Sequence, residues 1–299
     1  MLPDIPKRKY LIHKAVEFSA LPKKAQVELG SIEDMAASFM YVEQPKLDGC
    51  NCIAVTDGAD SCLYTRTGEV ICSCNHLRAE LLALAPGVYL GELWKYGVDQ
   101  PTISGWVRKK SEQRPELELH VFDYVPLEDF WNGYSASSFG TRHAFLIEQQ
   151  NGPHRLGKGI YVVPYWTCKP GVQVRADAAP RRFHDGVIMR KRSAPWEVGP
   201  DKYGNLIKVK PTVTYDLLCV DTYPGKGKYE GKIGGLVLSW KDGETLAVGG
   251  GLSDEQRNAA PEDLIGRIWE VQALGVSTKG VLREPRLKGV RFDKEEADY

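Results

Sequence analysis

One short segment, Lys46-Leu47-Asp48-Gly49, combines a nucleophile with a carboxylate at the end of an expected strand. Side chains in a strand repeat every second residue, so Lys46 and Asp48 face the same side, and Gly49 lets the chain turn tightly behind them. A lysine amine attacks phosphorus only when it is unprotonated, which requires burial or neighbouring positive charge. A carboxylate beside it can hold a divalent cation on phosphate oxygens. Taken alone, the segment is more often an exposed ion pair at a turn.

Residues of the types that nucleotide chemistry needs follow this segment in order. They are two carboxylates, an aromatic residue and two lysines on one expected strand face: Glu92, Asp185, Phe122, Lys208 and Lys210. Each has an ordinary alternative, such as a rim charge for Glu92, a core position for Phe122 and a solvated strand face for the two lysines. The ordered combination is much harder to explain in this way than any one of its members.

Several other enzyme signatures are missing from the sequence. No G-x-x-x-x-G-K-[ST] segment occurs, and the glycines of 225–228 lie between expected strands instead of opening a helix, which excludes a P-loop and a Rossmann fingerprint. Neither a G-x-S-x-G elbow nor an H-E-x-x-H pair is present. Five of the seven cysteines lie within 50–74. Their C-x-C spacing differs from the C-x-x-C pairs of zinc sites, which favours small buried side chains in a reducing compartment.

Length and composition indicate a folded chain of two domains, since 299 residues is about twice the usual domain size of roughly 150. Lysine plus arginine number 39 and aspartate plus glutamate also 39. Any nucleic-acid contact must therefore come from local basic patches. Lys14 and Glu17 interrupt the first apolar stretch too early for a signal peptide, and no run of about 18 apolar residues occurs. We expect a cytoplasmic protein that makes no membrane contact.

Short antiparallel strands are expected to position the candidate residues. Residues 1–30 carry prolines and basic residues that predict a strand and turns at the surface, and Ser31 with Asp34 begins a short helix over 32–39. The pattern that follows predicts an α+β domain with antiparallel sheets, including a meander, over residues 1–211. The expected strands are 40–43, 52–56, 62–65, 70–74, 88–95, 117–125, 160–167, 186–190 and 206–210, and the expected helices are 76–84 and 137–150.

After Pro211 the sequence changes character and predicts a second domain over residues 212–299. Short strands with glycine-rich turns are expected at 215–222, 235–240, 245–249 and 267–273. Ser253 with Gln256 at the third position begins a helix over 253–258. About five short strands with one helix in this length are typical of a small Greek-key β-barrel of the OB type.

With these motifs in order, the sequence from about 41 to 294 resembles the ATP-dependent DNA ligases of the small two-domain phage type. These belong to the covalent nucleotidyltransferase superfamily. In the first domain the matching segments are Lys46-Leu47-Asp48-Gly49, Thr65-Arg66-Thr67-Gly68, Gly91-Glu92-Leu93, Phe122-Asp123, Asp185-Gly186 and Lys208-Val209-Lys210. In the second domain they are 225–235, 249–257, 264–266 and 282–294, the last containing Arg291-Phe292-Asp293-Lys294. The resemblance implies a nucleotidyltransferase (adenylation) domain followed by an OB-fold domain.

The resemblance also implies a mechanism in which ATP and Mg²⁺, or another divalent metal, are cofactors. Lys46 would attack the α-phosphate of ATP to form lysyl-AMP, the adenylate would move to the 5′-phosphate of a nick, and the 3′-hydroxyl would displace AMP. Metal ions are assigned to the carboxylates of Asp48, Glu92 and Asp185. The residues assigned to ATP are Gln44 and Phe122 at adenine, Arg66 and Glu92 at ribose, Lys46, Lys208 and Lys210 at the α-phosphate, and Arg291 and Lys294 at pyrophosphate.

Three positions depart from the family pattern. Asn51 stands where most such ligases carry an arginine that meets the nick phosphate. Asp185 replaces the usual glutamate and is one methylene shorter. Gln44 replaces a frequent glutamate, so it keeps an amide oxygen for the adenine amino group but loses the charge.

The expected partner is nicked duplex DNA, bound by a monomer in DNA replication, repair and recombination, in the host cytoplasm if the protein is phage-encoded. Basic clusters expected to meet the duplex are Arg108 to Lys110, Arg181 and Arg182, Arg190 to Arg192, and Lys226, Lys228 and Lys232. Two alternatives stay open: an RNA ligase or mRNA-capping guanylyltransferase that shares the Lys46 chemistry, and a non-catalytic OB-containing DNA-binding protein.

Overall fold

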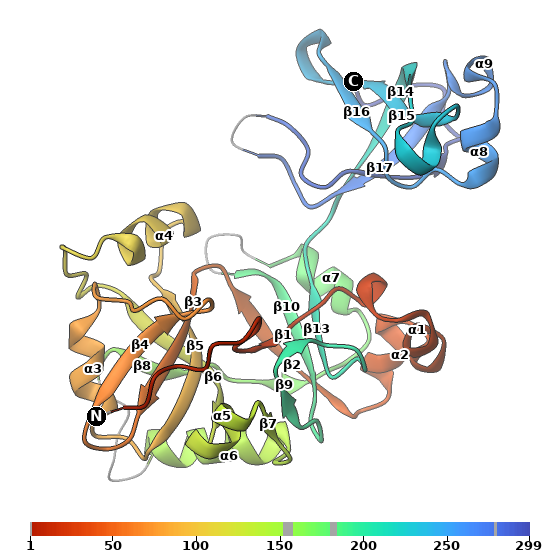
Figure 1. Ribbon diagram of the computed structural model, residues 1–299. Coiled ribbons are helices and arrows are strands. Elements are labelled where there is room, and N and C mark those ends of the chain that lie inside the picture. The colour runs from red at the N-terminus through yellow and green to blue at the C-terminus, as the bar shows by residue number, and fades with distance from the viewer. Residues whose placement is uncertain (1, 152–157, 180–183, 278–279) are drawn as a thin grey trace. The chain divides into compact units, whose positions relative to one another are not determined.

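The computed structural model describes residues 2–151, 158–179, 184–277 and 280–299 (Figure 1). The chain forms two compact units, Met1–Lys210 and Pro211–Tyr299. Arg181 and Arg182, expected in a basic cluster, lie outside the described residues. Within the described residues no helix is both long and apolar enough to cross a membrane.

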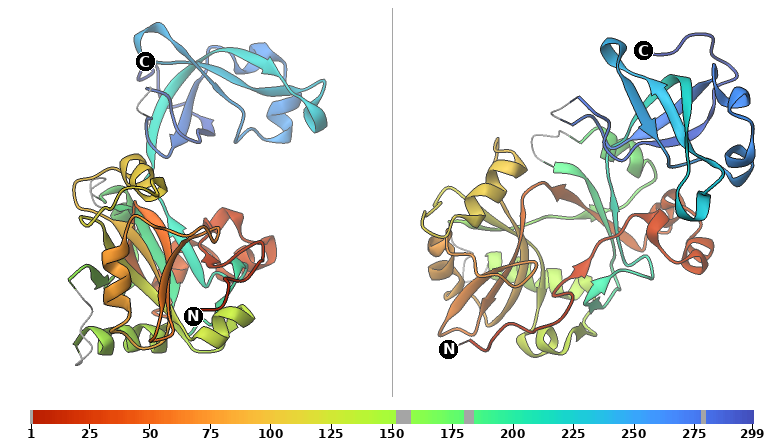
Figure 2. Two further views of the ribbon diagram at one scale, coloured as in Figure 1. Left: turned by 60° about the vertical axis from the view of Figure 1, so that its left-hand side comes forward. Right: turned by 45° about the horizontal axis from the view of Figure 1, so that its top comes forward.

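Two mainly antiparallel sheets form the centre of the first unit (Figures 1 and 2). The five-stranded sheet has the order β4 (Ser61–Thr65), β3 (Cys50–Thr56), β5 (Gly87–Trp94), β6 (Glu118–Val125) and β8 (Ile160–Val162). The four-stranded sheet has the order β13 (Leu206–Val209), β10 (His184–Lys191), β2 (Tyr41–Leu47) and β9 (Trp166–Thr167). The small pairs are β1 (His13–Lys14) with β12 (Gly199–Pro200), and β7 (Tyr134–Ser135) with β11 (Trp196–Glu197).

Helices cover these sheets. They are α1 (Lys23–Leu29), α2 (Ile32–Ala37), α3 (Asn75–Leu81), α4 (Gln100–Arg108), α5 (Leu127–Asn132), α6 (Phe139–Asn151) and α7 (Val172–Asp177), with a short 3₁₀ turn at Phe18–Ala20. The alternating residues of β3 show why both faces of the five-stranded sheet are covered. Cys52 and Ala54 belong to one hydrophobic cluster, while Ile53 and Val55 belong to another on the opposite face.

Two local expectations for this unit are wrong. No strand forms at 70–74, where Val70 makes only an isolated bridge to Tyr64 and Ile71 packs under α3 with Leu77. The expected meander is also interrupted, because β2 and β3 belong to different sheets. The turn between them is tight, since a Cβ on Gly49 would overlap the carbonyl oxygen of Leu93.

Several helices of this unit are not predicted by the sequence pattern. Helix α4 begins at the N-cap Asp99, whose carboxylate accepts a hydrogen bond from the N–H of Thr102 at 2.8 Å. Helix α1 lies in the segment expected to hold only a strand and turns. Helices α5 and α7 are not predicted either, and each is only 6 residues long. Such short helices give too few turns for a periodic pattern to be visible.

The second unit contains one curved five-stranded sheet of the order β16 (Thr245–Val248), β15 (Ile233–Ser239), β14 (Val213–Pro224), β17 (Ile268–Ala273) and β18 (Arg286–Val290). Strand β14 is long enough to pair with β17 through its first half and with β15 through its second. A single parallel bridge, between Gly250 and Arg286, connects the segment after β16 with β18. The expected OB-type arrangement is present, although no continuous ladder among the described residues closes the sheet into a barrel.

Helices α8 (Asp254–Asn258) and α9 (Pro261–Leu264) and two 3₁₀ turns, Gly227–Tyr229 and Lys241–Gly243, complete this unit. The Ser253 hydroxyl accepts from the N–H of Gln256, and the Gln256 side chain accepts from the N–H of Ser253, so the expected capping box is present. The core packs Trp269 against apolar residues of β14 and β15, including Leu217 and Leu236. The mixed α+β class predicted from the sequence is confirmed in both units.

Candidate active site

A cleft of about 820 Å³ lies in the first unit, and residues from both sheets, from α4 and from the segment 12–15 line it. Most of the first-domain residues expected at a nucleotide site are among them: Gln44, Lys46, Arg66, Glu92, Phe122, Asp185, Lys208 and Lys210. Asp48 follows β2 directly but is not part of this lining. The cleft therefore brings together residues that are far apart in sequence.

Lys46 lies at the end of β2, and its Nζ forms an ion pair with Asp185 at the start of β10. The two side chains are 22% and 29% exposed, so the pair lies at an open cleft wall and is not enclosed in the core. Gly186 fixes the backbone next to Asp185, because its φ of 125° is one that other residues rarely adopt. The candidate nucleophile is thus accessible and is held beside an acid.

Lys208 and Lys210 lie on one face of the segment formed by β13 and the residue after it. Their Nζ atoms are 3.8 and 3.3 Å from the same carboxylate oxygen of Glu17. Burial lowers the pKa of Lys208, and the charges of Lys210 and Lys46 lower it further against the opposing effect of Glu17. These lysines and Lys46 are therefore close enough for their positive charges to repel one another.

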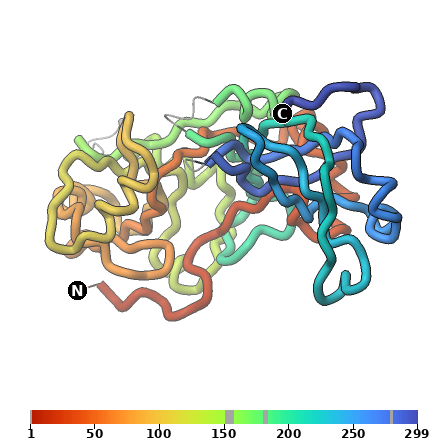
Figure 3. Tube along the Cα trace, turned by 90° about the horizontal axis from the view of Figure 1, so that it is seen from above, coloured from red at the N-terminus to blue at the C-terminus, as the bar shows by residue number. Residues whose placement is uncertain are grey.

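Glu17 is a member of the site that the sequence does not indicate. The segment that carries it runs next to β13, where the Lys208 N–H donates to the carbonyl of Val16 at 2.9 Å. Figure 3 shows this N-terminal segment in red crossing the first unit. No motif or spacing links residue 17 to residues 208 and 210, so only the tertiary structure reveals the pair.

Glu92 lies in β5 opposite Asn51 of β3. Burial raises the pKa of Glu92 to about 8; the Lys46 charge and the Gly49 N–H act in the opposite direction, and the charges of Asp48 and Asp185 add to the increase. The three carboxylates predicted to bind metal are therefore within electrostatic reach of one another. In the described part of the chain, however, no three acidic, histidine or cysteine side chains converge on one metal position.

Asp48, Glu92 and Asp185 nevertheless fit Mg²⁺ without forming a preassembled three-ligand site. Mg²⁺ takes oxygen ligands and is usually held by one or two carboxylates together with waters and substrate phosphates. The negative charges of Asp48 and Asp185 raise the pKa of Glu92, and a cation bound among the three would relieve this repulsion. A preassembled three-carboxylate site is not required for this mode of binding.

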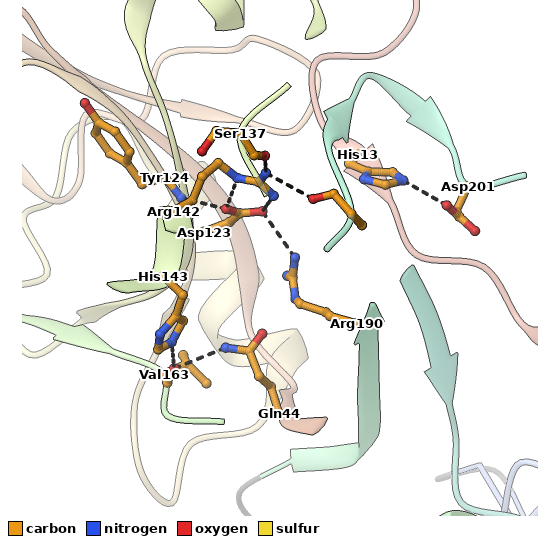
Figure 4. Close-up of polar contacts among 11 residues, drawn as sticks. His13, Gln44, Asp123, Tyr124, Ser137, Arg142, His143, Val163, Arg190 and Asp201 are labelled. Carbon is orange, nitrogen blue, oxygen red and sulfur yellow. Dashed lines mark hydrogen bonds and ion pairs between the residues drawn. The ribbon is translucent and has the colours of Figure 1, made fainter. Parts of the chain in front are cut away.

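The wall near Gln44 carries an unsatisfied acceptor. Gln44 is 2% exposed, and its Nε2 donates to the carbonyl of Val163 at 3.1 Å (Figure 4). His143 Nε2 contacts the same carbonyl at 2.9 Å. Gln44 Oε1 is buried and accepts no hydrogen bond from the described residues. Since an unpaired buried acceptor is costly, this oxygen fits a ligand that carries an N–H or O–H donor.

Phe122 forms part of the same wall, and Arg190 lies over its ring at 5.1 Å. Arg190, expected in a basic surface cluster, is only 7% exposed and pairs with Asp123 at 3.3 Å. Asp123 also accepts two hydrogen bonds from Arg142, at 2.8 and 3.0 Å (Figure 4). Although burial alone would raise the pKa of Asp123, the Arg142 and Arg190 charges hold it below its ordinary value. A buried ion network thus supports the aromatic wall.

The remaining candidates of the second unit, Arg291 and Lys294, both pair with Asp216 of β14, at 2.9 and 2.5 Å. Arg291 also binds Asp293 at 2.7 Å, which holds the pKa of Asp293 at about 2. The Asp293 hydrogen bond and the Asp216 charge raise the pKa of Arg291. Within this unit, Asp216 organises the two candidate cations, a partner that sequence spacing does not indicate.

Comparison with known proteins agrees with this architecture. Residues 224–291 match the family model of the DNA ligase OB-like domain. The structure named Pmar-Lig_PreS3 aligns with 93% of this chain and 67% of its own, with a TM-score of 0.68 and 20% identity. A Lig E DNA ligase aligns with 94% of this chain and 98% of its own, with a TM-score of 0.61 and 20% identity. The chain has the fold of a DNA ligase.

The ATP-dependent DNA ligase of bacteriophage T7, solved in complex with ATP, gives a TM-score of 0.51 at 17% identity, over 94% of this chain and 98% of its own. No curated protein sequence matches the chain. Within this ligase fold, the family-model match lies wholly in the second unit, while the cleft lies wholly in the first.

Asn51, one of the departures from the ligase pattern, lines the cleft. Its Nδ2 donates to the carbonyl of Gly91 at 3.3 Å, and its buried Oδ1 accepts no hydrogen bond from the described residues. Arg66 follows β4 and is exposed at the cleft wall. Asn51 and Arg66 therefore both line the same cleft as Lys46.

Proposed function

We propose that this protein is an ATP-dependent DNA ligase that seals nicks between a 3′-hydroxyl and a 5′-phosphate in duplex DNA through a lysyl-AMP intermediate. The observation that carries the proposal is the arrangement around Lys46. This accessible amine is surrounded by Asp185 and Glu92 and by the cations of Lys208 and Lys210, all within one cleft of the first unit. The ligase fold and the match to the OB-like domain support the choice of DNA as substrate.

Adenine would lie against Phe122, with its amino group donating to Oε1 of Gln44, the unpaired acceptor of the wall. Arg66 would bind the ribose, where Glu92 also lies within reach. Lys208 and Lys210 would hold the α-phosphate, since phosphate oxygens can replace the Glu17 carboxylate as their partner. These contacts would orient the α-phosphorus toward Lys46.

In the first step, Lys46 Nζ forms a bond to the α-phosphorus while the bond to pyrophosphate breaks. The ion pair with Asp185 must open before attack, because an ammonium group carries no free electron pair. Asp185 already accepts a hydrogen bond from Nζ and is placed to hold the proton that leaves. Arg291 and Lys294 are proposed to bind the departing pyrophosphate.

In the second step, a 5′-phosphate oxygen forms a bond to the same phosphorus while the bond from phosphorus to Lys46 Nζ breaks, and the nitrogen takes back the proton held by Asp185 so that Lys46 leaves as the free amine. In the third, the 3′-hydroxyl attacks the activated 5′-phosphate and AMP leaves. Bound Mg²⁺ would supply charge neutralisation on the phosphates, with Asp48, Glu92 and Asp185 as its proposed carboxylate ligands. Roles in DNA replication, repair and recombination, a monomeric state and a cytoplasmic location, in the host if the protein is phage-encoded, stay predictions.

The test is intact-mass measurement after incubation with ATP and Mg²⁺. The native chain is expected to gain one AMP group, and both Lys46→Ala and Lys46→Arg are expected to gain none. The arginine variant is the sharper one, because it keeps a positive charge beside Asp185 but lacks the amine nucleophile. Lys24→Ala, which changes a lysine with an 88% exposed side chain, is the control and should be adenylated like the native chain.

An adenylate on either Lys46 variant would refute the assignment of the nucleophile. Labelling by GTP instead of ATP would indicate a capping guanylyltransferase, and sealing of nicked RNA without sealing of nicked DNA would indicate an RNA ligase. If neither the native chain nor any variant is labelled and binding to nicked DNA is retained, the protein is a non-catalytic DNA-binding protein.

A further inference from the structure

The end of α4 carries a group of cations that the proposed nucleotide chemistry does not use. Arg108, Lys109 and Lys110 are consecutive and exposed, and Arg114 follows in the next loop. Lys109 pairs with Glu112 at 3.1 Å, and Arg114 pairs with Glu112 and with Glu116. Among the residues that the structure describes, Arg108 and Lys110 form no such ion pair, and these same two line the cleft. The group is therefore divided into neutralised cations outside the cleft and unneutralised cations at its wall.

The position of α4 is fixed by its neighbours in the five-stranded sheet. Cys50, the first residue of β3, pairs with Leu93 near the end of β5, and α4 follows β5 after a short connection. Ser104 of α4 hydrogen-bonds to the Cys50 side chain, and the Arg108 charge lies close enough to act on the same thiol. Burial is the main influence on Cys50 and raises its pKa, which the Arg108 charge partly offsets. Arg108 is thus located near Cys50, the residue that precedes Asn51 in β3.

The residues that line the cleft near Arg108 differ from those proposed to contact the nucleotide. Gln44 and Lys46 are two residues apart on the same face of β2, and the chain then turns at Gly49 toward Asn51. With a base at Gln44 and an α-phosphate at Lys46, Asn51 and Arg108 are cleft-lining residues that the proposed nucleotide contacts do not use. Transfer of an adenylate to a polynucleotide joins two phosphates, so both must be held at once. The cations that line the cleft come from different elements: Lys208 lies in β13, Lys210 follows that strand, and Arg108 is the last residue of α4.

We propose that Arg108 binds the 5′-phosphate of the nick, the acceptor in the second step, and supplies at α4 the positive charge that Asn51 lacks. The inference rests on the proposed ligase function. The Arg108 guanidinium can donate two parallel hydrogen bonds to a phosphate, which would hold the attacking oxygen in place. The β- and γ-phosphates of ATP offer the same chemistry, so the experiment must separate the two sources.

The experiment compares Arg108→Ala with the matched control Lys109→Ala, which removes the adjacent, neutralised cation. Binding is measured for nicked duplexes that carry either a 5′-phosphate or a 5′-hydroxyl. Rates are measured separately for adenylation of the protein by ATP and for transfer from pre-adenylated protein to the nick. The native chain is expected to prefer the 5′-phosphate, and Arg108→Ala to lose this preference and to slow transfer by about 10- to 100-fold. Lys109 belongs to a cluster expected to meet the duplex, so Lys109→Ala should weaken binding of both duplexes to the same extent, while it retains the preference for the 5′-phosphate and the native rate of transfer. Arg108→Lys should fall between the native chain and the alanine variant.

Adenylation of the protein by ATP is expected to be unchanged in Arg108→Ala. A slower adenylation with normal transfer would overturn the proposal and assign Arg108 to ATP. If Arg108→Ala and Lys109→Ala lose the preference for the 5′-phosphate to the same extent, the proposal is also overturned, because a diffuse basic surface would then explain DNA binding. If the native chain is never adenylated, the ligase proposal fails, whereas the comparison of 5′-phosphate with 5′-hydroxyl binding still tests Arg108.

Discussion

The charge on Lys46 is balanced by a residue 139 positions further along the chain, Asp185. Lys208 and Lys210 are likewise held by Glu17 of the N-terminal segment. The three lysines proposed to meet the α-phosphate are therefore paired with carboxylates in this structure. In the proposed function, binding of ATP would exchange these carboxylate partners for phosphate oxygens, so the lysines would keep an anionic partner throughout.

His143 gives a prediction at the scale of a single residue. It is buried, and burial lowers its pKa from 6.5. Because the unfolded chain then binds a proton that the folded one rejects, the free energy of unfolding should fall as pH falls below about 6.5. His143→Gln keeps an N–H donor for Val163 and should weaken this pH dependence. Urea denaturation at several pH values measures it.

His76→Gln is the control for this prediction, because His76 also contacts a backbone carbonyl, that of Leu117 at 3.0 Å. This variant measures how stability responds to the loss of an imidazole that contacts a carbonyl elsewhere in the first unit. An identical decline in stability toward low pH in the native chain and in His143→Gln would contradict the proposed role of burial.

At the scale of elements, strand β10 must bend where Asp185 meets Lys46. Its pairing with β2 shifts register between His184 and Val187, and Gly186 lies within that irregularity. A Cβ at Gly186 would overlap the carbonyl oxygen of Val209 on β13. The glycine is therefore required by a positive φ and by the close approach of a neighbouring strand at the same time.

Gly186→Ala should lower the free energy of unfolding by more than about 1 kcal/mol, because both the backbone angle and the neighbouring carbonyl oppose the added methyl group. Gly105→Ala in α4 is the matched control. Nothing lies within 4 Å of its added Cβ, and alanine in a helix should increase stability by about 0.5–1 kcal/mol. Urea denaturation compares the two variants, and equal stabilities would contradict this account of β10.

At the scale of the whole molecule, the two units have separate hydrophobic cores. Three clusters of buried residues lie within the first unit, and one cluster lies within the second. No described residue belongs to clusters of both units. Since most of the stability of a domain comes from burial in its own core, each unit has what it needs to fold by itself.

A fragment of residues 1–210 is therefore expected to unfold in one cooperative transition and to bind ATP. It should adenylate Lys46 far more slowly than the full chain, because it lacks Arg291 and Lys294, the proposed pyrophosphate ligands. Circular dichroism melting and intact-mass kinetics measure the two properties. A fragment without cooperative unfolding would show that the first core depends on the second unit, and an undiminished adenylation rate would remove Arg291 and Lys294 from the first step.

The predictable part of this protein was local. Strand periodicity located β2, β5, β6 and β10, and Ser253 with Gln256 located α8, because these signals depend on residues only a few positions apart. The ordered motifs also selected the residues that meet in the cleft. Helix α4 shows the limit of such signals: its N-cap Asp99 is present in the sequence, but Pro101 and Gly105 obscure the helical pattern that follows.

The sequence by itself determined the fold class, the position of Lys46 at a strand end and the residue types around it. Only the tertiary structure decided which charges are paired, since the partner of an ionic group is chosen by approach in space and not by distance along the chain. It placed Arg190 in a buried network instead of a surface cluster and set Glu17 against Lys208 and Lys210. It also placed Arg108 at the cleft wall without an ion pair to any residue that the structure describes. The sequence does not predict these ion pairs, because the energy of a charged side chain depends more on its burial and its partner than on its residue type.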